Sequence, residues 1–441
     1  MAELKDNSRK RISKPLKDNE GISRREALKT IGVMSAGISF LKIPENEICP
    51  PAFNAGLSSD ALRQDPILAE AISQLEYLTP AKKFIVQRRG NPVLPELPDE
   101  LLPSIGLTQE TWKLEIISDP ESDSELGNPF TIENNNALTW SGLMKMAEKH
   151  AVSYLHVLSC TNAPKPYGMG LWEGIPLREV LWQTKPGRNI RRIRFSGYHN
   201  NDPKQIFQSS LPINRVLEEI PGELPVILAY KLNGQYFSHA NGGPVRLFVP
   251  GFYGNRSIKW LQKIVLTNNH QANDTYADWN NDVESPVKTC AKFIKVPAEV
   301  RTNQMFAFTG MAQVGLLGLS KVQYCIMPAD EPPDANDPYL ALADWRDAMI
   351  LPPPANWGSD LPGGKLPGNL MQIDRKTGKL VSWPLPNTIV HWAASAKIDI
   401  PGKYDLRCRT IDANGTAQPM PRPFGRSGVN AIEAAKITAN S

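Results

Sequence analysis

Three short segments of the sequence combine residue types that can bind a metal and an anion. The first, Ser159-Cys160-Thr161-Asn162, follows an apolar run and opens into a loop, where functional side chains commonly lie. The second is Asn241-Gly242-Gly243-Pro244-Val245-Arg246, and the third is Gly254-Asn255-Arg256-Ser257-Ile258-Lys259. A cysteine thiolate is a soft ligand that suits a thiophilic metal. We therefore take Cys160 as the candidate metal ligand.

Arg246 and Lys259 lie on two predicted strands that a glycine-rich turn connects. Such a turn brings two cations together with free backbone N–H groups between them, an arrangement that holds a phosphate. Taken alone, the same pattern also fits two surface cations on a hairpin, and a single cysteine is more often a small buried hydrophobe. The order and spacing of the segments decide between these interpretations.

The motifs after Cys160 occur in a specific order. They are W-x-G-x-P-L-x-x-V-L at 172–181, G-G-P-V-R-L-x-V-P-G at 242–251 and G-x-x-x-x-K-W-L at 254–261. This order resembles the sulfite oxidase family of molybdopterin-dependent oxidoreductases, from about Phe84 to the C-terminus. Phe306–Leu317 also resembles the G-x-A-x-x-G strand of the family's immunoglobulin-like dimerisation domain, and residues 412–419 resemble its terminal D-x-x-G-x-x-Q-P.

The resemblance implies an α+β fold, with a sulfite-oxidase-type molybdopterin-binding domain followed by an immunoglobulin-like β-sandwich. It implies a molybdenum-molybdopterin cofactor, with the metal held by a pyranopterin dithiolene and by Cys160. Arg246 and Lys259 fall on the pair that binds the pterin phosphate, and Asn241 stands where the family usually has a histidine. The further residues that we expect at the cofactor are Arg88, Arg89, Asn162, Asp202 and Ser257.

On the substrate side the sequence departs from the family. Gln87 replaces the arginine of F-x-x-R-N-H, and Val283 stands where sulfite oxidases carry an active-site tyrosine. The residues after Cys160 are Thr-Asn-Ala-Pro-Lys rather than A-G-N-R-R. A pocket for a doubly charged anion needs cations to offset desolvation, so we expect a rebuilt pocket. The cations that can replace the missing ones are Arg88, Arg89 and Lys165.

Other side chains in these segments carry weaker signals. His156, His199 and His239 are proton-relay candidates, although a lone histidine is usually structural. Tyr167 and Tyr198 could hydrogen-bond an oxo group, whereas Trp172 and Trp260 are expected to be core aromatics.

The function that this resemblance implies is oxygen-atom transfer to or from a small, sulfur-containing substrate. No C-x-x-C-H motif is present, so we expect electrons to pass to a c-type cytochrome or another external carrier. The sandwich implies a homodimer. One alternative is a sulfane dehydrogenase or a sulfoxide reductase on the same site, and the other is a non-catalytic partner subunit.

Composition agrees with an enzyme of two or three domains. The chain has 441 residues, of which 41% are hydrophobic and 21% charged, which excludes a disordered or integral membrane protein. The net charge of +4 is too small to imply nucleic acid. We expect a molybdopterin-binding catalytic domain at 81–283 and the β-sandwich at 284–435, interrupted by a Pro/Gly-rich insertion at about 329–370. Residues 45–80 are expected to form a linker and a short helix over Pro66–Leu78.

The first 44 residues resemble a twin-arginine export signal. Ser23-Arg24-Arg25-Glu26-Ala27-Leu28-Lys29 precedes an apolar run, Ile31–Leu41, that is too short to span a bilayer. An ordinary amphipathic helix is the alternative. We expect a periplasmic or otherwise exported protein without a membrane span in its mature form. In such a protein, a disulfide such as Cys290–Cys325 would be compatible with the five scattered cysteines.

Local patterns predict the elements that position these residues. An apolar strand over Val152–Ser159 ends at Cys160, and a helix over Ser141–Lys149 precedes it. Further strands are predicted at Arg191–Tyr198, Leu224–Tyr230, Pro244–Val249 and Lys259–Leu266, and a helix is predicted to open over Pro176–Trp182.

Overall fold

The computed structural model describes residues 65–441, apart from 220–221, 332–334 and 359–360. The predicted export signal, Cys49 and most of the predicted linker therefore lie outside the described residues. None of the described helices combines the length and the apolar content that a membrane crossing requires.

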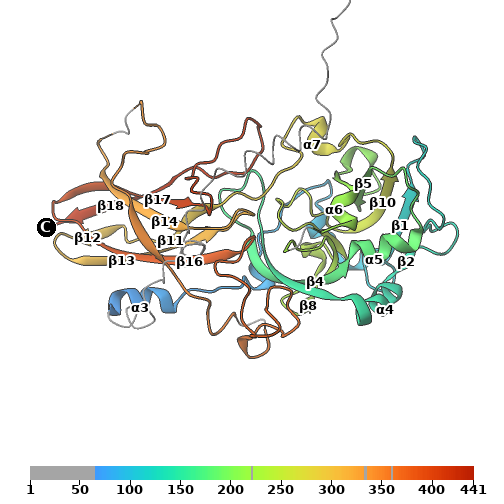
Figure 1. The fold of residues 1–441 in the computed structure, drawn as a ribbon, viewed down its shortest axis with the longest axis horizontal. Coiled ribbons are helices and arrows are strands. Elements are labelled where there is room, and N and C mark those ends of the chain that lie inside the picture. Colours follow the sequence, from blue (N-terminus) through green and yellow to red (C-terminus); the bar gives the residue numbers. More distant parts are fainter. Residues whose placement is uncertain (1–64, 220–221, 332–334, 359–360) are drawn as a thin grey trace, which may run out of the picture. The chain divides into compact units, whose positions relative to one another are not determined.

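Two five-stranded sheets build the part of the chain that carries the three motif segments (Figure 1). The first sheet has the order β2-β1-β10-β5-β6, with β1 and β10 parallel and the other neighbours antiparallel. Its strands are β1 Lys113–Ser118, β2 Leu138–Thr139, β5 Arg192–Gly197, β6 Gln208–Pro212 and β10 Leu261–Thr267.

The second sheet is antiparallel and carries the Cys160 strand. Its order is β3-β4-β7-β8, and β9 pairs with β7. Its strands are β3 Val152–Leu158, β4 Gly168–Pro176, β7 Ile227–Leu232, β8 Gln235–Tyr236 and β9 Arg246–Phe248. The helices of this part are α4 Trp140–His150, α5 Leu177–Leu181, α6 Ile213–Leu217 and α7 Thr275–Asp278.

One hydrophobic core joins the two sheets. Ile193 and Ile264 come from the first sheet and Ile175 and Leu228 from the second, and all four are fully buried. Strand β3 is buried along nearly its whole length, which matches the continuous apolar run that predicted it. Burial of both faces fixes the register of such a strand and thereby the point at which its chain emerges at Cys160.

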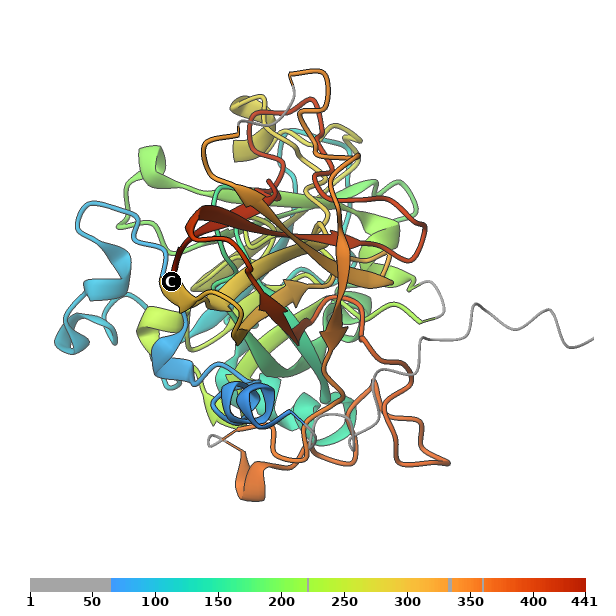
Figure 2. The same cartoon turned by 90° about the vertical axis from the view of Figure 1, so that its left-hand side faces the viewer.

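The strand-rich part after residue 284 forms one curled sheet of eight strands in the order β11-β13-β16-β15-β14-β17-β18-β12 (Figure 2). Its strands are β11 Cys290–Lys295, β12 Glu299–Arg301, β13 Met305–Gln313, β14 Lys321–Pro328, β15 Arg346–Ile350, β16 Ile389–Lys397, β17 Gly402–Ile411 and β18 Glu433–Asn440. The sheet encloses a second core around Phe308 and Trp392.

Three details differ from the sequence-based expectations. The insertion at 329–370 contains β15, which pairs with both β14 and β16 and so belongs to the sheet. Strand β18 continues past residue 435. Helix α3 covers only Pro66–Ser73. The residues after it contact distant parts of the chain instead of continuing the helix. The Leu78 amide donates to the Trp357 carbonyl, and the ring of Tyr77 meets that of His391 edge-on.

The disulfide with which the sequence was compatible, Cys290–Cys325, is absent, since both cysteines are free and buried. They lie on β11 and β14, which are not neighbours in the sheet. Burial raises the pKa of each thiol to about 11, so both behave as small apolar side chains.

The chain after β15 returns to cover the edge of β3. The amide group of Gln372 donates to the Leu155 carbonyl at 3.0 Å and accepts from the Leu155 amide at 2.7 Å. The Met371 amide donates to the Ser153 carbonyl at 2.9 Å. These bonds satisfy backbone groups that would otherwise be unpaired at a buried strand edge.

Candidate functional site

A cavity of about 430 Å³ collects side chains from all three motif segments. It lies beyond the end of β3, where Cys160 is half-buried. Seven of the nine residues predicted at the metal or cofactor line this cavity. They are Cys160, Arg89, Asn162, Asn241, Arg246, Ser257 and Lys259.

Arg88 and Asp202 do not line the cavity. The Arg88 guanidinium is 69% exposed and pairs with Glu96 at 2.9 Å. Asp202 instead caps a short 3₁₀ helix, where its carboxylate accepts from the Lys204 amide at 3.0 Å and from the Gln205 side chain at 3.1 Å. A carboxylate with local backbone donors is drawn to them. The structure therefore does not bring Arg88 and Asp202 together with the other predicted site residues.

Cys160 has a well-defined polar environment. Its thiol lies 3.0 Å from the side-chain oxygen of Asn162. Tyr167 is close enough that the Cys160 charge contributes, after burial, to raising the pKa of its phenol. The Tyr167 hydroxyl donates to the Gln87 side-chain oxygen at 2.6 Å. The glutamine that replaces the expected arginine is therefore tied to the tyrosine beside Cys160.

Two cations in the cavity lining, Arg246 and Lys259, have no acidic partner in the described part of the chain. Arg246, only 3% exposed, donates to the carbonyls of Asn241 at 3.0 Å and Ser257 at 3.2 Å. Its Nε is buried without a partner among the described residues. The ammonium of Lys259 donates to the Ala240 carbonyl at 3.2 Å.

The pKa values of these cations reflect that arrangement. Burial, followed by repulsion from Arg246 and Arg89, lowers the pKa of Lys259 to about 7. Burial lowers the pKa of Arg246 to about 10. Buried cations that repel one another are stabilised by an anion placed between them. The site therefore fits a phosphate group.

Gly242 allows the close approach that this geometry needs. Its φ is +97°, and an added Cβ would lie 2.7 Å from Cγ of Lys259. Only glycine combines that backbone conformation with that contact. The neighbouring helical turn, His239–Asn241, presents its carbonyls to Arg246 and Lys259.

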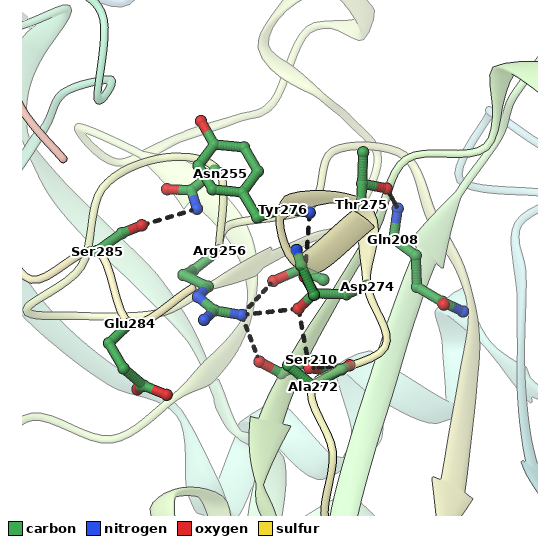
Figure 3. Close-up of polar contacts among 12 residues, drawn as sticks. Gln208, Ser210, Asn255, Arg256, Ala272, Asp274, Thr275, Tyr276, Glu284 and Ser285 are labelled. Carbon is green, nitrogen blue, oxygen red and sulfur yellow. Dashed lines mark hydrogen bonds and ion pairs between the residues drawn. The ribbon is translucent and has the colours of Figure 1, made fainter. Parts of the chain in front are cut away.

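Several residues of the lining were not predicted from the sequence, and Tyr276 is one of them. The Asp274 carboxylate accepts from the amides of Tyr276 and Ala277 and so begins helix α7 (Figure 3). The Tyr276 hydroxyl lies 2.7 Å from that of Thr161, the residue after Cys160. Val283, at the position where a tyrosine was expected, does not line the cavity.

Arg426 is another lining residue that the sequence did not predict. It comes from the loop between β17 and β18. The Gly428 amide of this loop donates to the Thr161 carbonyl at 3.1 Å. Arg422, in the same loop, pairs with Asp282 at 3.0 Å, and Lys288 donates to the Gly428 carbonyl at 3.2 Å. The strand-rich part of the chain thus contributes directly to the cavity beside Cys160.

The remaining candidates have structural surroundings. His156 is fully buried, accepts from the Gly251 amide at 2.9 Å, and has a pKa lowered to about 4 by burial, so it is neutral. His239 bonds to the Leu94 carbonyl at 2.6 Å, and His199 to the Gly197 carbonyl at 3.2 Å. None of the three lines the cavity, nor does Lys165.

The aromatic candidates do line it. Trp172 is buried, stacks on Phe248 at 4.0 Å between ring centroids, and meets the Arg246 guanidinium at 5.4 Å. Trp260 is also buried and meets the Lys259 ammonium at 5.3 Å. Both rings therefore belong to the core and also form part of the cavity wall, as does Tyr198.

The comparisons with known proteins agree with this site. The family model described as "oxidoreductase molybdopterin binding domain" matches residues 104–275. A nitrate reductase [NADPH] of Beauveria bassiana is 36% identical over 97 residues, which are 22% of this chain and 10% of that protein. A nitrate reductase of Neurospora crassa is 27% identical over 252 residues, or 52% of this chain and 24% of that protein. The matches thus span about a quarter or less of the length of these relatives.

Among solved structures, the sulfane dehydrogenase SoxCD of Paracoccus pantotrophus has a TM-score of 0.53 at 16% identity, covering 89% of this chain and 96% of that one. This similarity concerns the fold. Residues 104–275 thus match a molybdopterin-binding oxidoreductase domain of the kind found in the sulfite oxidase family, and such a domain implies a molybdenum-molybdopterin cofactor.

Proposed function

We propose that this protein transfers an oxygen atom to or from a small, sulfur-containing substrate and exchanges electrons with an external carrier. The observation that carries the proposal is that one cavity contains both Cys160 and two cations, Arg246 and Lys259, that have no acidic partner among the described residues. A thiolate and an anion site in one cavity suit a cofactor that carries both a metal and a phosphate.

In this proposal the cofactor phosphate is held by Arg246 and Lys259, and Cys160 is the protein's ligand to molybdenum. Asn162, Asn241 and Ser257 line the space between. The bound cofactor supplies two-electron oxygen-atom transfer. In the oxidative direction, the substrate sulfur gains one oxygen from water, and two electrons and two protons are released. The chain's own residues bind and orient the substrate beside Cys160.

The substrate side supports a pocket that differs from a sulfite pocket. Gln87 is neutral, and the cations that line the same cavity include Arg89, Lys204 and Arg426. Tyr167 and Tyr276 place hydroxyl groups close to the Cys160 loop. These groups can bind an anionic group and donate hydrogen bonds to a substrate oxygen.

A second candidate is a sulfane dehydrogenase on the same site, favoured by the fold shared with SoxCD. A sulfoxide reductase would use the same cofactor residues in the opposite direction. Turnover assays of the molybdenum-loaded protein with sulfite, thiosulfate-derived sulfane compounds, sulfoxides and nitrate separate these reactions. Turnover of sulfite that is lost in Cys160→Ala would contradict the rebuilt pocket.

The non-catalytic alternative has its own test. Purified protein from cells that make the cofactor contains molybdenum if the proposal is right. Protein that lacks molybdenum under those conditions would support a partner subunit instead. We further propose export through the twin-arginine-like signal, a c-type cytochrome as the electron carrier, and a homodimer formed by an immunoglobulin-like domain in the strand-rich part.

A further inference from the structure

Three aromatic rings lie next to one another in the lining of the cavity. The ring centroids of Phe207 and Tyr276 are 6.1 Å apart, those of Phe207 and Trp279 are 6.1 Å apart, and those of Tyr276 and Trp279 are 6.2 Å apart. We call these three residues the aromatic pad. All three line the cavity, and Trp279 remains 54% exposed. A core ring would be covered by protein, so the indole of Trp279 has surface left for a ligand.

Buried polar contacts hold the pad in place. Arg256 and Asp274 are each 1% exposed and pair at 3.0 Å. The other carboxylate oxygen of Asp274 accepts from the first amides of helix α7, which carries Tyr276 (Figure 3). The rings therefore stand in fixed positions before any ligand arrives, and a preorganised surface binds at a lower entropic cost.

The pad begins next to the metal-binding residue. The Tyr276 hydroxyl lies 2.7 Å from that of Thr161, and Thr161 follows Cys160 in the chain. A molecule lying on the pad would thus extend toward the reacting centre. Trp279 marks the outer end of the same surface, since its ring is the exposed one.

The chemistry of the pad selects against bare inorganic oxyanions. Such an ion is strongly hydrated and has no apolar surface to remove from water, so aromatic rings offer it nothing. Two guanidinium groups lie over rings of the pad: Arg89 over Phe207 at 4.8 Å and Arg426 over Trp279 at 5.4 Å. A ring face flanked by cations suits a ligand with an apolar or planar body and one negative group.

We propose that the substrate is a small organic anion whose apolar or planar body lies on the aromatic pad, with its sulfur directed toward Cys160. This proposal rests on the proposed function of the cavity and specifies its substrate class. It makes Trp279 a specificity-determining residue.

The test compares two sulfonates that share the same charged group. Isothermal titration calorimetry of the molybdenum-loaded protein measures Kd for benzenesulfonate and for methanesulfonate. We expect benzenesulfonate to bind about tenfold more tightly, since ring stacking of this kind is worth about one power of ten in Kd. Trp279→Ala should reduce the ratio to near one, and Trp279→Phe should retain most of it.

Trp182→Ala is the matched control, because Trp182 is similarly exposed and lies outside the cavity lining. It should leave the ratio unchanged. Equal affinities for the two sulfonates in the unaltered protein, or an unchanged ratio in Trp279→Ala, would overturn the proposal. So would a Trp279→Ala variant that keeps the ratio and loses affinity for a c-type cytochrome, since the pad would then be a protein docking surface.

The proposed function and the proposed substrate class are tested by different measurements. Molybdenum analysis of the same preparations tests the function, whereas the sulfonate ratio can be measured whether or not the metal is present. A protein without molybdenum that still discriminates between the sulfonates would contradict the function and leave the pad as a ligand site.

Discussion

The buried pair of Arg256 and Asp274 gives a sharp test of how the site is held. Both side chains are 1% exposed, and the Asp274 carboxylate accepts from Arg256 at 3.0 Å and from the Ser210 hydroxyl at 2.8 Å. Asp274→Asn removes the charge but keeps a side chain that caps helices as well as aspartate does. The change therefore isolates the ion pair and leaves Arg256 as an unpaired buried charge.

Leaving a buried charge without its partner costs about 3–5 kcal/mol. For a domain of this size, each kcal/mol lowers the melting temperature by roughly 2–4 °C. We therefore expect Asp274→Asn to lower the melting temperature of the catalytic part by on the order of 10 °C, measured by circular dichroism or calorimetry.

Asp374→Asn is the control, because Asp374 caps two amides on the exposed surface and has no ion-pair partner in the described residues. It should change the melting temperature by about 1 °C or less, the size of a surface substitution. Adding Arg256→Met to Asp274→Asn should recover part of the loss, since the unpaired charge is then gone. Equal shifts for Asp274→Asn and Asp374→Asn would refute this account of the pair.

Three further predictions concern the anion site and the loop that contains Gly428, whose amide donates to the Thr161 carbonyl. Lys259 has a pKa lowered to about 7, so it loses its proton as pH rises from 6 to 8. The charge of sulfate is constant over this pH range, so the Kd of the metal-free protein for sulfate should rise with pH. Lys259→Arg should abolish this pH dependence of Kd. Gly242→Ala should weaken sulfate binding at pH 6, because the new Cβ lies 2.7 Å from Lys259 Cγ, whereas Gly234→Ala, also at positive φ but in open space, should not. Gly428→Ala would place a Cβ 2.3 Å from the Tyr253 hydroxyl, and it should lower the melting temperature by several degrees; a neutral result would contradict the close packing of this loop.

The elements that the sequence predicted well are those with strong local patterns. The apolar run before Cys160 predicts β3, and the structure starts it at the predicted Val152. The helix expected at Ser141–Lys149 is α4, longer by one residue at each end. The continuous apolar run of β3 is buried along nearly its whole length, and the apolar face of α4 packs on the core through Leu143 and Met144.

Contacts that are distant in sequence were not predictable in this way. The amide of Gln372 bonds to both backbone groups of Leu155, and Arg426 reaches the cavity from a loop beyond β17. Neither residue lies in a motif. The role of each depends on how a distant part of the chain folds back, Gln372 onto β3 and Arg426 onto the cavity. Tyr276 carried a local signal, since an aspartate two residues earlier is a typical helix N-cap.

Two predicted site residues lie outside the cavity lining for local reasons. Pro203 follows Asp202. The Asp202 carboxylate accepts hydrogen bonds from the Lys204 backbone amide and the Gln205 side-chain amide and does not reach the cavity. Arg88 is drawn outward by Glu96. The cofactor-binding roles of the residues that do line the cavity remain predictions.

The central claim is that Cys160 is the protein's ligand to molybdenum. X-ray absorption at the molybdenum edge tests it most directly, on unaltered protein and on Cys160→Ser with equal pterin content. We predict one fewer sulfur neighbour of molybdenum in Cys160→Ser, replaced by a lighter atom. Identical sulfur coordination in the two loaded proteins would contradict the claim.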